Sequence, residues 1–249
     1  MTPPKAPTYG GQADLYRRLR PDYPDAVFER LAAECGDRHA LAAELGAGSG
    51  QATARLLGIF DKVIAIEPDK QMAALMPRDP RLEVRLQWAE KATFKAPLDA
   101  IVAATAFHWM DARAVCELAR KSLRPGGVFM PFGYGPFRFV APAAAQRLGD
   151  AEYEFWKPWM DARLVRWRHY ADLVEETGLA KSVERFDHVF DRQYAAEDAA
   201  GLLMTTSYAA TVEREQPGYA KSFTRRVIKA AGGEPITIRF GLMGAIARF

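Results

Sequence analysis

The chain has 249 residues, with 34 Lys and Arg against 31 Asp and Glu, which gives a formal net charge of +3. With 49% hydrophobic and 26% charged residues, the composition excludes disordered, collagen-like and disulfide-stapled proteins and predicts one globular domain over residues 1–249. The charge excess is spread along the chain, so nucleic acid is not an expected partner. Cys35 and Cys116 lie far apart in the sequence, so we expect reduced, buried thiols.

The chain shows no pattern of a membrane or metal-binding protein. Residues 1–7 hold no apolar core of signal-peptide length, and the apolar stretch 128–145 is interrupted by three prolines and Arg138. The four histidines stand apart with no i, i+4 pair, so no metal is expected. These features predict a cytoplasmic protein that does not bind a membrane. The sequence leaves open whether it is a monomer or a homodimer.

The first 36 residues are expected to form an N-terminal cap. The prolines at positions 21 and 24 indicate a turn, because each proline disfavours the α conformation in the residue before it. A helix is predicted to follow, with Asp25 as its N-cap and Gly36 as its end.

Beyond the cap, short apolar runs alternate with helical patterns. The runs predict strands over residues 41–45, 63–66, 82–86, 98–104 and 128–132. Helices are expected between them over residues 51–60, 70–75 and 112–123. Continuous apolar strands separated by helices are typical of a parallel sheet covered on both faces, so the first half predicts a doubly wound, Rossmann-like α/β fold.

The second half begins with an aromatic segment. Nine of the 37 residues in 134–170 are aromatic, 24% against 11% for the whole chain, and residues 134–182 are expected to form a lid of helical insertions. Its aromatic residues could line a substrate pocket or pack as a helical layer on the sheet. A helix over 170–178, a strand over 183–190, helices over 196–211 and 220–231 and a last strand over 236–249 are then predicted.

A glycine-rich loop, ELGAGSG at residues 44–50, follows the first predicted strand. Glycines at alternate positions let the backbone turn sharply and let a ligand approach closely. The pattern is G-x-G-x-G preceded by Glu44, whereas a dinucleotide fingerprint would place a third glycine where Gln51 stands. A tight strand-to-helix turn can also require glycine for packing alone.

Glu67 ends the second predicted strand, 21 residues after Gly46. An acid at this place can accept both hydroxyls of a ribose. The alternative is that Glu67 caps the helix after Pro68, although Asp69 is better placed for that role.

With these features, residues 16–132 resemble the class I methyltransferases that depend on S-adenosylmethionine (SAM). The strings YRRLRPDYP at 16–24 and AFHWMD at 106–111, together with the pair Ala89-Glu90, are similar to the small-molecule group that includes the trans-aconitate methyltransferases. The resemblance implies a seven-stranded sheet, mostly parallel with an antiparallel last strand. It also implies SAM as cofactor, S-adenosylhomocysteine as product, and in-line methyl transfer to a small molecule, with a carboxylate or other oxygen nucleophile as a candidate acceptor.

The loop, the strand ends and the resemblance together define the expected site. The expected cofactor-binding residues are Tyr16, Arg20, Glu44, Gly46, Ala47, Gly48, Gly50, Glu67, Pro68, Trp88, Ala89, Glu90 and Ala104. The expected substrate-binding residues are Tyr23, His108, Trp109, Tyr134 and Trp156. Trp88 stands where many relatives have Asp or Ser, so the resemblance implies that the adenine contacts the backbone of Ala89 and Glu90 or stacks on a ring.

His108 and Trp109 are the catalytic candidates. His108 could act as a general base, because an unperturbed imidazole has a pKa near neutrality, or both side chains could pack beneath the cofactor. Arg20 could pair with a carboxylate of SAM or of the substrate, or could be an ordinary surface residue. Two other functions stay open, a nucleotide-dependent oxidoreductase and a SAM-binding protein without catalysis.

Overall fold

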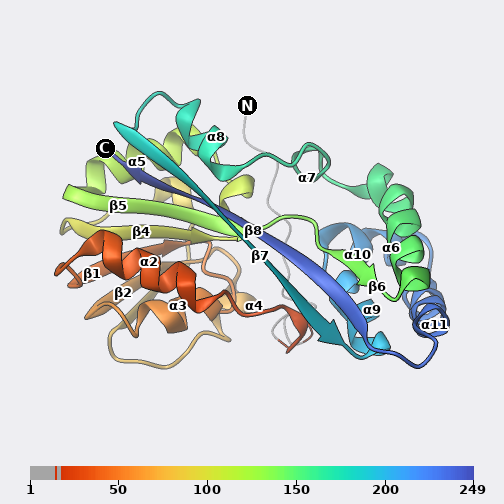
Figure 1. Cartoon of the computed structure of the whole chain (residues 1–249). Helices are drawn as coiled ribbons and strands as arrows, with labels where there is room; N and C mark the ends of the chain where they lie inside the picture. The colour runs from red at the N-terminus through yellow and green to blue at the C-terminus, as the bar shows by residue number, and fades with distance from the viewer. Residues whose placement is uncertain (1–14, 16–17) are drawn as a thin grey trace.

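The computed structural model describes residue 15 and residues 18–249, and it is built around a mixed β-sheet (Figure 1). The sheet order is β3-β2-β1-β4-β5-β8-β6, and β7 also pairs with β8. Neighbours among the first five strands are parallel, and β8 is antiparallel to β5, β6 and β7. The strands are β1 (Leu41–Leu45), β2 (Lys62–Ile66), β3 (Leu82–Arg85), β4 (Leu98–Ala104), β5 (Leu123–Tyr134), β6 (Arg138–Ala141), β7 (Ser182–Tyr194) and β8 (Ile236–Arg248).

The doubly wound sheet and its antiparallel last strand are confirmed, but the number of strands is not. The resemblance implies seven strands, whereas the described residues form eight. The additional strand, β6, continues the line of β5 along β8, since Tyr134 pairs with Leu242 and Arg138 pairs with Arg239. Pro136 lies between β5 and β6, and a proline has no N–H to give to the ladder, which explains the break.

Helices cover both faces of the sheet. On one face lie α2 (Asp25–Cys35) and α3 (Gln51–Leu56), whose apolar residues join the core of β1, β4 and β5. On the other face lie α5 (Ala112–Ser122) and α8 (Tyr170–Glu175), which pack on the opposite side chains of the same strands. Because β4 is buried along its whole length, it has an uninterrupted apolar sequence apart from Asp99.

The start of α2 differs from the prediction. The helix begins at Asp25 and its N-cap is Pro24, which has no side-chain acceptor, so the expected capping by Asp25 is wrong. Asp25 lies in the first turn, where a negative charge is still favourable beside the helix dipole. The helix ends at Gly36 as predicted, in a backbone conformation with φ of 58°.

Four helices form a separate group at one end of the long strands β7 and β8 (Figure 1). We call this group the helical lobe, and it consists of α6 (Ala143–Trp156), α9 (Ala196–Met204), α10 (Ser207–Glu215) and α11 (Tyr219–Ala231). Buried polar side chains join α6 to α11. The Trp156 indole donates to the Tyr219 hydroxyl over 2.8 Å, and the Tyr219 hydroxyl donates to Glu152.

The helical lobe differs from the predicted elements in two ways. The single helix predicted over residues 196–211 is two helices, because Thr205 and Thr206 turn their hydroxyls back to the carbonyls of Leu202 and Leu203 between α9 and α10. The lid predicted over residues 134–182 supplies α6 of the lobe, whereas α9, α10 and α11 come from the chain after it. The short helix α7 (Ala162–Val165) links α6 to α8, and α8 packs on the sheet.

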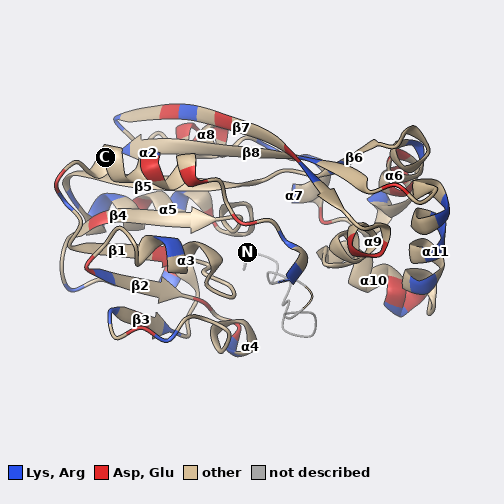
Figure 2. Ribbon diagram, turned by 60° about the horizontal axis from the view of Figure 1, so that its bottom comes forward, with Lys and Arg blue, Asp and Glu red and all other residues tan. Residues whose placement is uncertain are grey.

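Charged residues of both signs are interspersed over the described part of the chain. Figure 2 shows Lys and Arg next to Asp and Glu on helices and strands of both the sheet region and the helical lobe. Each helix in residues 18–249 is too short or too polar to cross a bilayer. Both cysteines are buried thiols, as the sequence predicts.

Candidate functional site

A cavity of about 600 Å³ opens at the carboxyl ends of β1, β2 and β4 and extends to the helical lobe. This volume is typical of a small-molecule site. The predicted residues that line it are Arg20, Tyr23, Glu44, Gly46, Ala47, Gly48, Glu67, Pro68, Trp88, Ala89, Glu90, Ala104, His108, Trp109 and Tyr134. Gly50 and Trp156 do not line it, and Tyr16 lies outside the described residues.

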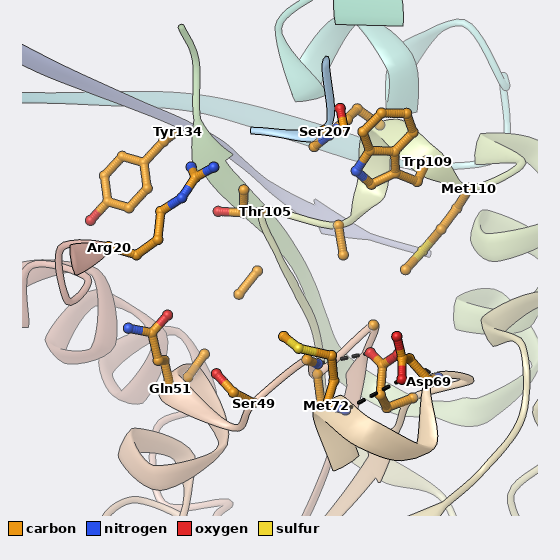
Figure 3. Close-up of a pocket in the computed structure, with 18 of the residues that line it drawn as sticks. Arg20, Ser49, Gln51, Asp69, Met72, Thr105, Trp109, Met110, Tyr134 and Ser207 are labelled. Atoms are coloured by element: carbon orange, nitrogen blue, oxygen red, sulfur yellow. Dashed lines mark hydrogen bonds between the residues drawn. The ribbon is translucent and has the colours of Figure 1, made fainter. Parts of the chain in front are cut away.

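The glycine loop forms one wall of the cavity. Gly46, Gly48 and Gly50 all have positive φ, at 69°, 57° and 86°, a region that residues with a β-carbon rarely adopt. The N–H groups of Gly46 and Ala47 both donate to the carbonyl of Ile66, over 2.8 and 3.0 Å, so the loop is anchored to the end of β2. Ser49 and Gln51 lie along the same side of the cavity (Figure 3).

The three glycines have different neighbours. A β-carbon on Gly46 would lie 2.6 Å from that of Ala106, so this glycine lets the end of β4 pack against the loop. A β-carbon on Gly50 would lie 2.8 Å from Pro77, on the side away from the cavity. Gly50 is the N-cap of α3, and its role is therefore packing and helix initiation. A β-carbon on Gly48 would make an ordinary van der Waals contact with the Met72 side chain, at 3.6 Å.

Glu67 joins the glycine loop to the segment after β2. One carboxylate oxygen accepts the N–H of Gly48 over 2.8 Å, and the other accepts the N–H of Asp69 over 2.8 Å. Burial raises the pKa of the carboxyl, and these two backbone bonds act against the rise. Each oxygen keeps a second lone pair that a ligand hydroxyl could use. Asp69 caps α4 (Lys70–Ala73) by accepting from Gln71 and Met72, as the sequence predicts (Figure 3).

Glu44 lies beneath the loop as a largely protonated carboxyl. It is buried and accepts a hydrogen bond from the Thr53 hydroxyl of α3. Burial, more than any other cause, raises the pKa of the Glu44 carboxyl to about 8. A neutral Glu44 can donate as well as accept, so it holds α3 against β1 without a buried negative charge.

The segment after β3 forms a second wall. Trp88 precedes a short 3₁₀ turn, Ala89–Lys91, and Trp88, Ala89 and Glu90 all line the cavity. The Glu90 carboxylate accepts the N–H of Asp111 over 3.1 Å, which ties this turn to the segment that follows β4. The turn Ala89–Lys91 and the segment that follows β4 are therefore held together beside the glycine loop.

The end of β4 redirects the chain into the cavity. Thr105 has φ of 52°, the one positive value of a residue other than glycine in the described part of the chain. Its hydroxyl accepts a 2.8 Å hydrogen bond from Tyr23, and its N–H donates to Phe132 over 2.7 Å. The 3₁₀ turn Phe107–Trp109 starts two residues later, so this backbone conformation presents His108 and Trp109 to the cavity. Figure 3 shows Trp109 there, near Met110.

His108 is enclosed by aromatic rings. Its ring centroid lies 4.7 Å from that of Trp109 and 4.8 Å from that of Trp167, and its Nδ1 lies 2.6 Å from the Tyr170 hydroxyl. Burial, followed by the positive charge of Arg163, lowers the pKa of His108 to about 3. An imidazole with this pKa stays neutral at physiological pH and removes protons poorly, which weighs against the general-base hypothesis.

The helical lobe, the segment between β5 and β6 and the segment that runs from α6 to α8 together supply the far part of the cavity lining. Here the lining is mainly aromatic and apolar, and it includes Phe137, Tyr153, Met160, Leu164, Trp167, Ser207 and Tyr208. The predicted substrate residue Trp156 is instead fully buried between α6 and α11, where it donates to Tyr219. Tyr153 lies three residues earlier on α6 and reaches the cavity in its place.

Arg20 connects the N-terminal region to this far part. Its Nε donates to the Thr205 hydroxyl over 3.0 Å, and its guanidinium carbon lies 4.9 Å from the centre of the Phe137 ring. Within the aromatic segment, Arg163 binds Asp161 and Arg168 binds Glu176. Neither of these two lines the cavity.

Ser207 and Tyr208 were not predicted from the sequence. They lie in α10, about 100 residues beyond the motif at 106–111, and the periodic apolar pattern there indicates only a helix. Glycine spacing and strand ends predict which residues form the cofactor side of such a site. Contacts made by a distant insertion have no comparable local signal.

Part of this chain is similar to known methyltransferases. Residues 43–129 match the family described as a methyltransferase domain. A Dictyostelium discoideum protein named as a methyltransferase is 31% identical over 157 residues, 60% of each chain, and an uncharacterized Mycobacterium bovis methyltransferase is 36% identical over 48% of this chain and 49% of its own. The chain thus spans about half to three fifths of these curated relatives.

Solved structures show the same fold. An Anaeromyxobacter dehalogenans protein described as a methyltransferase superposes with a TM-score of 0.73 at 24% identity, over 92% of this chain and 97% of that one. The superposition extends past the family match into the helical lobe. The domain match and the curated relatives show that part of this chain is similar to methyltransferases, and the solved structure shows that the fold is shared.

Proposed function

We propose that the protein transfers the methyl group of SAM to a small-molecule acceptor, with an oxygen nucleophile such as a carboxylate as the receiving atom. The observation that carries this proposal is the extent of the cavity. It runs from the glycine loop, past His108 and Trp109, to the helical lobe, so a cofactor region and a second region of different chemistry share one space.

The cofactor side has the chemistry that SAM requires. The positive φ values of Gly46 and Gly48, which residues with a β-carbon rarely adopt, shape the loop backbone against which the methionine part would lie. The spare lone pairs of Glu67 suit the two ribose hydroxyls. Trp88, Ala89 and Glu90 would border the adenine. Bound SAM supplies a methyl group already activated on a sulfonium, so the chain needs chiefly to orient the acceptor and exclude water.

The second region suits a compact organic acceptor. Phe137, Tyr153 and Trp167 give it apolar and aromatic walls, and Arg20 adds a positive charge beside Phe137. Apart from the neutral Glu44, the acidic residues that line the cavity are Glu67, Asp69 and Glu90, and all three belong to the cofactor side. This separation of charge favours an anionic acceptor in the second region. The motif at 106–111 and the string at 16–24 support kinship with the trans-aconitate methyltransferase group as a finer hypothesis.

The two alternatives make different demands on the same cavity. An oxidoreductase needs a dinucleotide loop, and Gln51 occupies the position of its third glycine. A non-catalytic SAM-binding protein needs no acceptor space, whereas the lobe residues Tyr153 and Tyr208 line additional volume here.

Methyl transfer can be tested with SAM carrying an isotopically labelled methyl group and a panel of small carboxylic acids, phenols and amines. The proposal predicts a product of increased mass from at least one oxygen acceptor, together with S-adenosylhomocysteine in equal amount. Binding of SAM with no transfer to any acceptor class would favour the non-catalytic alternative. Transfer to amines alone would overturn the oxygen nucleophile.

A further inference from the structure

The hydrogen bond between His108 and Tyr170 connects the cavity to the hydrophobic core between α8 and the sheet. Tyr170 begins α8 and is fully buried, with its ring at 5.5 Å from that of Phe107 in an edge-to-face arrangement. Its hydroxyl lies 2.6 Å from Nδ1 of His108. An imidazole nitrogen is a better acceptor than a phenol oxygen, because its conjugate acid has the higher pKa, so the phenol O–H donates.

The groups around His108 keep the ring neutral. Arg163 and Arg20 face it with positive charge, and Asp161 faces it with negative charge that Arg163 already binds over 2.8 Å. The indoles of Trp109 and Trp167 lie against its ring, with centroids 4.7 and 4.8 Å away. A neutral imidazole has one N–H donor and one bare nitrogen. If Nδ1 accepts from Tyr170, the proton is on Nε2.

Nε2 is the nitrogen left for a ligand. His108 lines the cavity, and within residues 18–249 its ring nitrogens make one hydrogen bond, in which Nδ1 accepts from the Tyr170 hydroxyl. We propose that Tyr170 is a positioning residue that holds His108 in the Nε2–H form, so that His108 donates a hydrogen bond to the methyl acceptor and does not remove a proton from it. This inference rests on the proposed methyl transfer and narrows its acceptor.

This donor role limits the methyl acceptor to compounds whose nucleophilic atom is already deprotonated when they bind. Another candidate base near the lobe is Tyr208, but burial raises its pKa to about 12, so it stays protonated. A lone pair of the acceptor oxygen forms the new bond to the methyl carbon while the carbon–sulfur bond breaks. The bonding electrons stay on sulfur, and the positive sulfonium and the negative acceptor give two neutral groups. No proton passes to the protein.

The direct test is nitrogen NMR of protein labelled with ¹⁵N-histidine, in the presence of S-adenosylhomocysteine, from pH 5 to 8. The wild type is expected to show His108 with Nε2 protonated and Nδ1 bare throughout this range. Tyr170→Phe is expected to give a mixture of tautomers. Tyr219→Phe removes another buried hydroxyl that is bonded in the helical lobe, and this control should leave the His108 signals unchanged.

Three results would overturn the inference: an imidazolium at pH 6, an Nδ1–H tautomer in the wild type, or an unchanged tautomer in folded Tyr170→Phe. The wild-type spectrum decides the first two even if the variant does not fold. This readout does not depend on turnover, so failure of methyl transfer and failure of the tautomer assignment are separate outcomes.

Kinetics give a second readout once an acceptor is found. His108→Gln places an amide N–H near the position of Nε2, and we expect kcat to fall by no more than about tenfold, the effect of one neutral hydrogen bond. Loss of a general base would lower kcat by roughly 10²–10⁴-fold. A fall of that size in folded His108→Gln would contradict the donor role. So would a pH dependence of kcat that follows a group with a pKa near that of an ordinary histidine.

Discussion

Replacing Gly46 by alanine tests whether the glycine loop is set by its contact with the end of β4. Two costs add in Gly46→Ala. The φ of 69° is left-handed, which costs a residue with a β-carbon roughly 1–2 kcal/mol. The new β-carbon would also lie 2.6 Å from that of Ala106, and relieving such overpacking costs about 1–3 kcal/mol. We expect the free energy of unfolding to fall by about 2–5 kcal/mol.

Gly178→Ala is the matched control for the backbone cost. Gly178 has φ of 65° and open space where its β-carbon would lie, so only the cost of roughly 1–2 kcal/mol applies. Urea unfolding at pH 7 measures both variants, and calorimetry measures their affinity for S-adenosylhomocysteine. Adding Ala106→Gly to Gly46→Ala should recover part of the packing cost in a double-mutant cycle. Equal losses in Gly46→Ala and Gly178→Ala, with no coupling to Ala106, would refute the contact.

Three further predictions concern buried polar groups. Glu44 has a pKa of about 8 in the folded protein against 4.5 in the unfolded chain, so the folded state binds more protons and loses stability as pH rises from 5 to 9. Glu44→Gln has no such group, so its stability in thermal unfolding should rise relative to wild type over this pH range. A stability difference between variant and wild type that does not change with pH would contradict this. Thr105→Val removes the acceptor of the Tyr23 hydroxyl and should lower the free energy of unfolding in urea by roughly 1–3 kcal/mol. Thr105→Ser keeps the acceptor and should stay near wild type. Equal losses in the two variants would exclude the hydrogen bond as the cause. Glu67→Gln turns an amide donor toward the N–H of Gly48 or Asp69, and calorimetry should show at least tenfold weaker binding of S-adenosylhomocysteine, whereas unchanged affinity would remove Glu67 from the proposed site.

The sheet could be predicted because its signal is local. Strands buried on both faces have continuous apolar sequences, and β1 and β4 begin and end at the predicted residues. The residues at the carboxyl ends of these strands follow from the topology, because ends of parallel neighbours meet at one edge. Glycine spacing and Glu67 therefore led to the cofactor side of the cavity directly from the sequence.

The acceptor side could not be predicted in the same way. Trp156 and Tyr153 lie on the same helix with similar spacing, yet Trp156 is buried against Tyr219 and Tyr153 lines the cavity. Periodicity identifies an apolar face but does not say which partner covers it. Ser207 and Tyr208 reach the cavity because α9 ends at Thr205, a break that two threonine hydroxyls produce and that the apolar pattern does not show.

The pKa of His108 also depends on tertiary structure. In the sequence this residue is a histidine after a strand, with an ordinary pKa near neutrality. In the fold, Trp109 and Trp167 enclose the ring and Arg163 lies close to it, so its pKa falls to about 3. His108 lines the cavity, as the sequence predicts. Its low pKa weighs against the general-base alternative, and the hydrogen-bond donation that we propose in its place depends on contacts that the sequence does not show.

The central claim is that this cavity binds an adenosyl sulfur compound, and calorimetric titration of the purified protein tests it most directly. S-adenosylhomocysteine and SAM should each bind with submillimolar affinity at one site per chain and compete with each other, and NADH should give no saturable heat. Saturable binding of NADH without binding of either adenosyl ligand would contradict the account and make the glycine loop a dinucleotide site.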